Sequence, residues 1–393
     1  MNYQKIDSDR NLADYCNQLA QCRSIAFDTE FVSENTYRPV LCLIQVAADD
    51  RLAVIDPLTI DDMTPFWDVL AAEGHETIVH AARGEVEFCL EAIGKLPAGL
   101  VDVQLAAGLA GVEYPAGYAT LIARLLGRKT SKHETRTDWF ARPLSDRQID
   151  YALDDVRYLH PLRDALFARL EQLDRLSWLA EEMAEQCDQI AHSLGQHRWR
   201  RVSGSSGLNR RSLAIVRELW QWRDEEARRR NKPARWILRD DLIAELARRR
   251  TADPQRILAV RGMQRRDLSR LLPAMVAAIQ RALDLEEGEC PEILHKEKGP
   301  QLSVLGQFLF AALGSVCRHA KLAPNLVGSP SDIRDLVAYR TGDASKPPLP
   351  PRLARGWRAE FVGRLFDDLL AGKKVIRIAD PASDHPLVFE PGE

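Results

Sequence analysis

Two acidic residues, Asp28 and Glu30, lie in one short apolar stretch near the N-terminus, residues 25–31, which reads IAFDTEF. The stretch predicts a β-strand, and side chains two apart on a strand lie on the same face. Two carboxylates beside apolar residues repel each other, which costs free energy unless a cation neutralises them. Oxygen ligands of this kind suit Mg²⁺ or Mn²⁺. A strand end that emerges into water is the simpler explanation of this pair taken alone, so the metal-site hypothesis requires further acids.

A third carboxylate is predicted to share a helical face with a phenol. Residues 145–148 have the capping-box form S-x-x-Q, which begins a helix that we expect to continue through Tyr151 and Asp155 toward Leu170. Tyr151 and Asp155 are four residues apart, so both side chains lie on one face of that helix. An ordinary helix surface is the alternative interpretation of this pair taken alone.

The elements around these residues predict a mixed α/β sheet. Three consecutive strands are expected at residues 23–31, 38–47 and 51–56, and the short gaps favour antiparallel neighbours. Helices and strands then alternate, with helices near 62–73 and 84–93 and strands near 77–80 and 100–102. This order predicts a sheet covered by helices on both faces.

The composition is that of a globular protein with two to three domains. The chain has 393 residues, of which 45% are hydrophobic and 28% charged. No apolar run approaches the ~20 residues that a membrane helix needs, and the polar N-terminus is no signal peptide. We therefore expect a cytoplasmic protein without a membrane partner, and we expect a monomer. The seven cysteines are scattered without a CxxC spacing, which favours reduced packing residues over disulfides or a zinc site.

Charge is distributed unevenly along the chain. Residues 1–200 contain 20 Lys and Arg against 32 Asp and Glu, whereas residues 206–285 contain 19 against 10. An acidic part suits cations and a basic part suits a polyanion, although a charged helical surface can also serve solubility. The Gly- and Ser-rich residues 203–207 indicate a break between domains. We predict domains at 1–200, 208–287 and 300–378, followed by a loosely ordered tail over 380–393.

Together these motifs resemble ribonuclease D, in the tyrosine-containing branch of the DEDD superfamily of 3′→5′ exonucleases. The first motif spans residues 27–31 and 36–46, and the third spans residues 137–159. Residues 208–284 resemble an HRDC domain, a helical nucleic-acid-binding module, and residues 300–378 resemble a diverged second copy. The resemblance implies a ribonuclease H-like exonuclease domain followed by two all-α HRDC-like domains.

The resemblance also implies roles for the acids. Asp28, Glu30 and Asp155 would hold the first of two divalent ions, Mg²⁺ or Mn²⁺, and Asp28 would also contact the second. Tyr151 would orient the attacking water rather than act as a base, since an unperturbed phenol is protonated at neutral pH.

The second motif departs from the family pattern. Residues 80–85 read HAARGE, so that Glu85 stands where the family has an aspartate. Glu85 would support the second ion, but its extra methylene can displace a ligand oxygen by about 1 Å, and such a misplacement can cost ~100-fold in rate. A catalytically weakened RNA-binding protein is therefore one alternative function.

RNA is the expected partner, with tRNA precursors and other structured RNA as substrates and 5′-mononucleotides as products. A DNA exonuclease is the second alternative, because only the 2′-hydroxyl distinguishes the substrates. Basic and aromatic side chains are the candidates for substrate contacts, through phosphates and stacked bases. They are Phe31, Tyr37, Arg142, Arg229, Arg230, Lys232 and Trp236. For the aromatic residues, packing in a core is the alternative interpretation.

Overall fold

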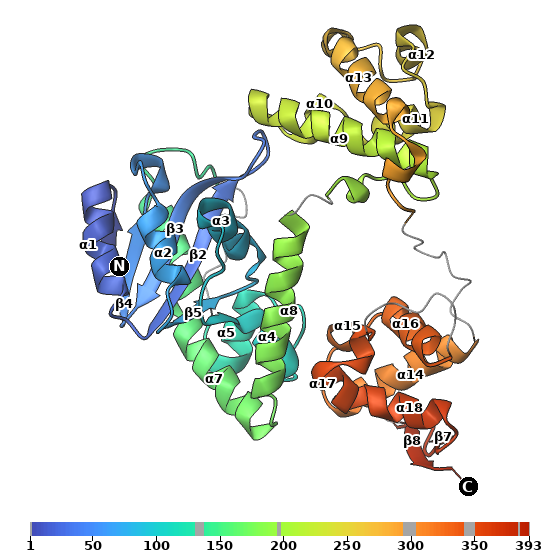
Figure 1. Ribbon diagram of the computed structural model, residues 1–393. Coiled ribbons are helices and arrows are strands. Elements are labelled where there is room, and N and C mark those ends of the chain that lie inside the picture. The colour runs from blue at the N-terminus through green and yellow to red at the C-terminus, as the bar shows by residue number, and fades with distance from the viewer. Residues whose placement is uncertain are drawn as a thin grey trace.

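The computed structural model describes residues 2–129, 137–194, 198–293, 304–341, 350–383 and 386–392. A six-stranded mixed sheet forms the centre of the N-terminal part, with the strand order β1-β4-β3-β2-β5-β6 (Figure 1). The strands are β1 (Gln4–Ile6), β2 (Ser24–Val32), β3 (Val40–Ala48), β4 (Arg51–Ile55), β5 (Glu76–Val79) and β6 (Leu100–Asp102). The mixed sheet confirms the predicted fold class.

The middle of the sheet is antiparallel and its edges are parallel. Strands β2, β3 and β4 pair as antiparallel neighbours, as their short connections predicted, whereas β1, β5 and β6 join as parallel strands. The β2–β3 register shifts at a bulge between Glu30 and Phe31. Strand β1 was not predicted, because three residues are too few to show an alternating pattern.

Helices cover both faces of this sheet. Ile25 and Phe27 point to the core under α1 (Asp9–Leu19), α2 (Thr64–Ala71) and α3 (Arg83–Ile93). The intervening Ala26 points to the core on the other face. The helices that follow along the chain are α4 (Val103–Leu109), α5 (Tyr118–Leu126), α6 (Asp146–Arg157), α7 (Leu159–Gln172) and α8 (Leu176–Leu194).

The capping box predicted at Ser145 is present. The Ser145 hydroxyl accepts from the Gln148 backbone N–H (3.3 Å), and the Gln148 side chain accepts from the Ser145 N–H (2.9 Å). The predicted single helix toward Leu170 is wrong, because α6 ends at Arg157 and α7 begins at Leu159. Pro161 explains the break, since a proline cannot donate to the carbonyl four residues earlier and its ring clashes with that carbonyl.

The HRDC-like region has a hydrophobic core of its own. Its helices are α9 (Arg210–Arg230), α10 (Ala234–Ile237), α11 (Asp240–Arg249), α12 (Pro254–Leu258) and α13 (Arg266–Asp284). The side chain of Asn209 caps α9 by accepting from the backbone N–H of Ser212. Trp199 and Val202 already pack into this core, so the packing of this domain begins upstream of the predicted break at residues 203–207.

The third region is helical but ends in a β-hairpin. Its helices are α14 (Val304–His319), α15 (Pro324–Val327), α16 (Pro330–Thr341), α17 (Gly356–Arg358) and α18 (Arg364–Leu370). Strands β7 (Lys374–Ile378) and β8 (Leu387–Pro391) then pair as antiparallel neighbours. The expected loosely ordered tail is therefore wrong for the paired residues of β8.

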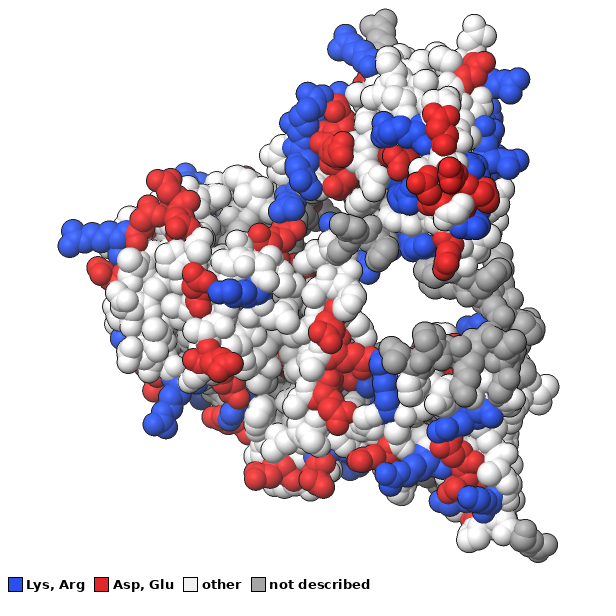
Figure 2. Space-filling view, viewed as in Figure 1, with Lys and Arg blue, Asp and Glu red and all other residues white. Residues whose placement is uncertain are grey.

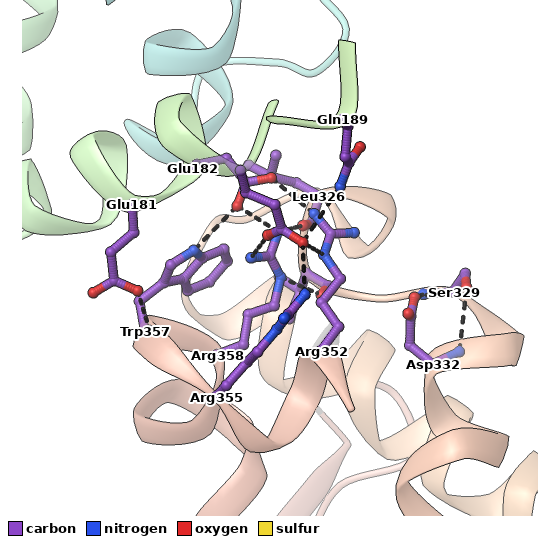
Figure 3. A network of polar contacts seen from close by, with 12 residues as sticks. Glu181, Glu182, Gln189, Leu326, Ser329, Asp332, Arg352, Arg355, Trp357 and Arg358 are labelled. Atoms are coloured by element: carbon purple, nitrogen blue, oxygen red, sulfur yellow. Dashed lines mark hydrogen bonds and ion pairs between the residues drawn. The ribbon is translucent and has the colours of Figure 1, made fainter. Parts of the chain in front are cut away.

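The third region shares one hydrophobic core with the exonuclease domain. Leu179 and Met183 of α8 belong to the same cluster as Leu309 and Trp357. The rings of Trp178 and Trp357 stack with their centroids 4.8 Å apart. Beside them, Glu182 of α8 accepts from Trp357 Nε1 and from arginines of the third region (Figure 3).

The cysteines and the helices also bear on the expectations from composition. All seven cysteines carry free thiols and are buried, which fits their predicted role in packing. Among the described residues, no helix combines the length and the apolar character needed to span a membrane.

Candidate active site

Three carboxylates from two elements far apart in the sequence converge where α6 packs against the sheet. Asp28 and Glu30 project from β2, and Asp155 projects from α6, which packs against β2 and β3. One carboxylate oxygen from each residue lies within 4.8 Å of the others. The alternating strand and the capped helix thus bring together the residues that each element was predicted to present.

Burial and mutual repulsion disfavour the charged form of these acids. The pKa of Glu30 rises to about 8, through burial first and then the charges of Asp155 and Glu85. Burial raises the pKa of Asp155 to about 7. The pKa of Asp28 lies well above its usual range, through burial and then the charges of Glu85, Asp155 and Glu30. Carboxylates held in this way are stabilised by a bound cation.

Tyr151 is placed to act as a hydrogen-bond donor to this cluster. A hydrogen bond from Tyr151 lowers the pKa of Asp155 and partly opposes the effect of burial. The pKa of Tyr151 itself is raised, by burial first and then by the negative charges of the cluster, so the phenol stays protonated. The indole of Trp139 packs on its ring, with the centroids 6.0 Å apart.

Glu85 lies in the first turn of α3, next to the cluster. It does not belong to the group of three described residues, Asp28, Glu30 and Asp155, whose carboxylate oxygens lie within 4.8 Å of one another. It is 5% exposed, and its Oε1 accepts a 2.9 Å hydrogen bond from the Thr29 hydroxyl. Burial raises its pKa to about 7. The longer side chain is therefore held in a defined position, with Oε1 engaged by Thr29.

The turn before α3 is fixed by Asp102, the last residue of β6. Its carboxylate accepts from the backbone N–H groups of Ala81 (2.9 Å) and Ala82 (3.0 Å) and also caps α4. Ala81 adopts a φ of 64°, which this pair of hydrogen bonds helps to hold. Asp102 and Thr29 thus position Glu85, and sequence reasoning missed both roles.

Of the predicted substrate contacts on the exonuclease domain, Phe31 remains accessible. Its side chain is 41% exposed and meets Phe88 edge to face, with the centroids 5.5 Å apart. The bulge next to Glu30 interrupts the strand alternation at this residue. Phe31 is therefore a surface aromatic beside the acids and not a core residue.

Tyr37 and Arg142 are engaged elsewhere. The Tyr37 hydroxyl donates to Asp224 of α9 (2.7 Å), so it joins the exonuclease domain to the HRDC domain. Arg142 donates to both oxygens of Asp56 and to three backbone carbonyls, those of Cys42, Trp139 and Ala141. All five of its N–H groups are used, so the predicted phosphate contact is replaced by a structural role.

The predicted HRDC contacts are exposed to different degrees. Arg229 and Arg230 both bond to the carboxylate of Glu226, which offsets part of their charge. Trp236 is 45% exposed, whereas the following Ile237 and Leu238 are buried. The ammonium of Lys232 lies 5.8 Å from the centre of the Trp236 ring. The exposed Trp236 indole, with the Lys232 ammonium nearby, is therefore accessible for the predicted stacking on an RNA base.

Comparisons with known proteins agree with the geometry. A family model described as 3′-5′ exonuclease matches residues 3–171, and an HRDC domain model matches residues 212–279. Ribonuclease D of Acidiphilium cryptum is 36% identical, with 91% of this chain and 90% of that protein covered. Ribonuclease D of Gluconacetobacter diazotrophicus is 34% identical, with 94% and 92% covered.

A solved structure extends the likeness to the whole architecture. The crystal structure of Escherichia coli RNase D, described as an exoribonuclease involved in structured RNA processing, superposes with a TM-score of 0.82. It is 29% identical and covers 94% of this chain and 99% of its own. This chain belongs to the ribonuclease D family and is a 3′→5′ exoribonuclease, a hydrolase of phosphodiester bonds.

Proposed function

We propose that this chain trims the 3′ ends of structured RNA, tRNA precursors foremost, by hydrolysis that depends on two divalent cations and releases 5′-mononucleotides. The observation that carries the proposal is the convergence of Asp28, Glu30 and Asp155 within 4.8 Å. Membership of the ribonuclease D family supports degradation in the 3′→5′ direction, and the involvement of E. coli RNase D in structured RNA processing supports structured RNA as the substrate class.

The donor set fits Mg²⁺ or Mn²⁺. All three side chains offer carboxylate oxygens, which are the ligands that these ions prefer. Asp28, Glu30 and Asp155 would hold the first ion, and Asp28 and Glu85 would serve the second. A pair of bound divalent ions would supply an activated water and stabilise the charge on the phosphate and the leaving oxygen.

The remaining side chains position the reactants. Tyr151 stays protonated and donates to Asp155, so its hydroxyl is fixed where it can orient the attacking water. Trp139 limits the movement of that phenol by packing on its ring. Phe31 offers an exposed aromatic face to the terminal nucleotide.

The test is an assay of a tRNA precursor with a 3′ trailer, beside a DNA strand of the same sequence and structure. We expect 5′-mononucleotides to be released from the RNA in Mg²⁺ or Mn²⁺, and no release in EDTA. Equal rates on DNA would support the DNA exonuclease instead. Binding without release would support the weakened RNA-binding protein.

Glu85 provides a second test of the same site. Glu85→Gln keeps an acceptor for the Thr29 hydroxyl but removes the negative charge, and we expect a loss of about 10- to 100-fold in rate, as for partners beyond the direct ligands. Glu85→Asp restores the family residue while shortening the reach to Thr29. A rate increase in Glu85→Asp would show that the extra methylene weakens catalysis in the natural chain.

A further inference from the structure

A cleft of about 420 Å³ lies between the exonuclease domain and the HRDC domain. Phe31 and Gly84 line it, and each is the sequence neighbour of a site acid, Glu30 or Glu85. Side chains of α9 and of the short 3₁₀ helix Arg198–Arg201 line it from the HRDC side. The cleft therefore starts beside the carboxylate cluster and leads away from it toward the basic domain.

The acids that line this cleft are already engaged by protein groups. Their partners are Arg83 for Glu87 (2.9 Å), Arg38 for Glu91 (3.7 Å), Tyr37 for Asp224 (2.7 Å) and Arg223 for Asp240 (2.6 Å). Arg198 and Arg201 also line the cleft, both are exposed, and neither forms an ion pair or side-chain hydrogen bond with another residue that the structure describes. The cleft thus offers two uncompensated positive charges.

The local fold presents these two arginines together. Side chains three residues apart on a 3₁₀ helix lie one above the other, so Arg198 and Arg201 share a face. Trp199 and Val202, one position later in each case, are buried in the HRDC core and hold the short helix in place. Arg200 is directed elsewhere, since it stacks on Trp199 and donates to the Glu292 carbonyl.

We propose that this cleft binds the single-stranded 3′ segment of the RNA upstream of the scissile bond, with Arg198 and Arg201 binding successive backbone phosphates. The guanidinium group suits this task because its planar array of donors matches phosphate oxygens. Phe31 and Trp220 line the same cleft and give bases an aromatic surface to stack on. The assignment rests on the proposed function, because it places the 3′ end at the carboxylates.

The test compares wild type with Arg198→Ala/Arg201→Ala on single-stranded RNA oligonucleotides of two to eight residues. A dinucleotide is too short to extend far into the cleft, so we expect kcat/KM to be unchanged on it. On longer RNA we expect a fall of about tenfold for each lost phosphate contact, mainly through KM. The slope of log binding affinity against log salt should also become shallower by about 1.4, or ~0.7 for each phosphate.

The matched control is Arg10→Ala/Arg23→Ala, which removes the same charge from exposed positions. Arg10 is in α1 and Arg23 precedes the opposite end of β2 from Phe31. This control should retain wild-type rates at every length. An equal loss on dinucleotide and octanucleotide, or no loss on either, would overturn the assignment. Absence of release by the wild type would instead count against the proposed function, so the two failures are distinguishable.

Discussion

Two clusters of acidic side chains in this molecule differ in what neutralises them. Asp28, Glu30 and Asp155 form the first, and no Lys or Arg of the described ranges makes an ion pair with them. The second, Glu182 and Glu185 on α8, meets arginines of the third region (Figure 3). The same residue type thus forms a candidate cation site in one place and a joint between domains in the other.

The second cluster is neutralised within the protein. Arg358, which is buried, reaches Glu182 (2.6 Å) and Glu185 (3.3 Å), and its other donors bond to the carbonyls of Leu326 and Val327. Arg352 adds a 2.8 Å contact to Glu182. In Figure 2, acidic side chains gather in the region of α8 beside basic side chains of the third region. Because its counter-charges come from the chain, this cluster stabilises the fold without a ligand.

The HRDC domain is attached differently from the third region. It has its own core, and between the described residues its hydrogen bonds to the exonuclease domain come from Tyr37. The Tyr37 hydroxyl donates to Asp224 and the Tyr37 backbone N–H donates to Asn231 (3.3 Å). Basic side chains are prominent on the face of this domain shown in Figure 2. The third region is thus built as an extension of the exonuclease domain, whereas the HRDC domain leaves a cleft beside the exonuclease domain, which we propose holds the substrate.

The largest expected effect is on catalysis. Asp155→Asn removes one of the three convergent carboxylates, and we expect mononucleotide release to fall by more than about 100-fold, beyond the usual loss for an outer-shell partner. The same change should raise the stability of the metal-free chain at pH 8, because it removes a repelling charge. Asp154→Asn is the control, because Asp154 is the neighbouring acid on α6 but forms an ion pair with Arg157 (3.2 Å) and is not one of the three convergent carboxylates. Similar losses in both variants would contradict the assigned roles.

The second cluster should show the opposite response. Arg358→Met leaves Glu182 without its buried partner, and we expect the free energy of unfolding to fall by about 3–5 kcal/mol. Arg355→Met removes a more exposed partner of Glu185 and should cost about 0–1 kcal/mol. Denaturant titration of the full chain measures both. Equal costs would show that the buried pair is not the joint between the domains.

The pH dependence of stability separates the clusters further. The folded chain raises the pKa of Glu30 to about 8 and the pKa of Asp155 and of Glu85 to about 7. Between the ordinary carboxyl pKa of about 4 and these raised values, the folded chain therefore binds more protons than the unfolded chain. Stability of the metal-free chain should therefore fall as pH rises from about 5 to 8. A divalent cation competes with these protons and should oppose the fall.

Calorimetry in Mg²⁺ and in EDTA checks this expectation. The melting temperature gained from Mg²⁺ should be larger at pH 8 than at pH 6, and Asp155→Asn should reduce the difference. A gain that is equal at both pH values, or larger at pH 6, would mean that these acids do not hold the cation.

The smallest effect is expected at the HRDC attachment. Tyr37→Phe removes one hydrogen bond to a carboxylate, that of Asp224. The lost bond should weaken the contact between the two domains by about 1.5–3 kcal/mol at most. Unfolding of each domain core should be little changed, whereas fluorescence energy transfer between labels on the two domains should show a broader distribution of distances. Tyr3→Phe is the matched control, because Tyr3 packs near another core of the exonuclease domain. An unchanged distribution in Tyr37→Phe would show that other contacts fix the HRDC domain.

The sequence predicts the position of a side chain well where local patterns determine it, and poorly where its partner lies far away in the sequence. Asp28, Glu30 and Asp155 could be predicted because an alternating strand and a capping box each determine a face locally. The roles of Tyr37 and Arg142 could not, because their partners Asp224 and Asp56 lie 187 and 86 residues away. Only the folded structure shows that Tyr37 and Arg142 donate hydrogen bonds to these two carboxylates. The β7–β8 hairpin was missed for a related reason, since its two short strands are separated in the sequence by residues 379–386, which contain two prolines.

The most direct test of a cation site at the three carboxylates is anomalous diffraction from crystals grown with Mn²⁺. We expect Mn²⁺ at a position where Asp28, Glu30 and Asp155 are all ligands, and we expect that ion to be lost in Asp155→Asn. Mn²⁺ bound only elsewhere, in a protein that still releases mononucleotides from RNA, would contradict it.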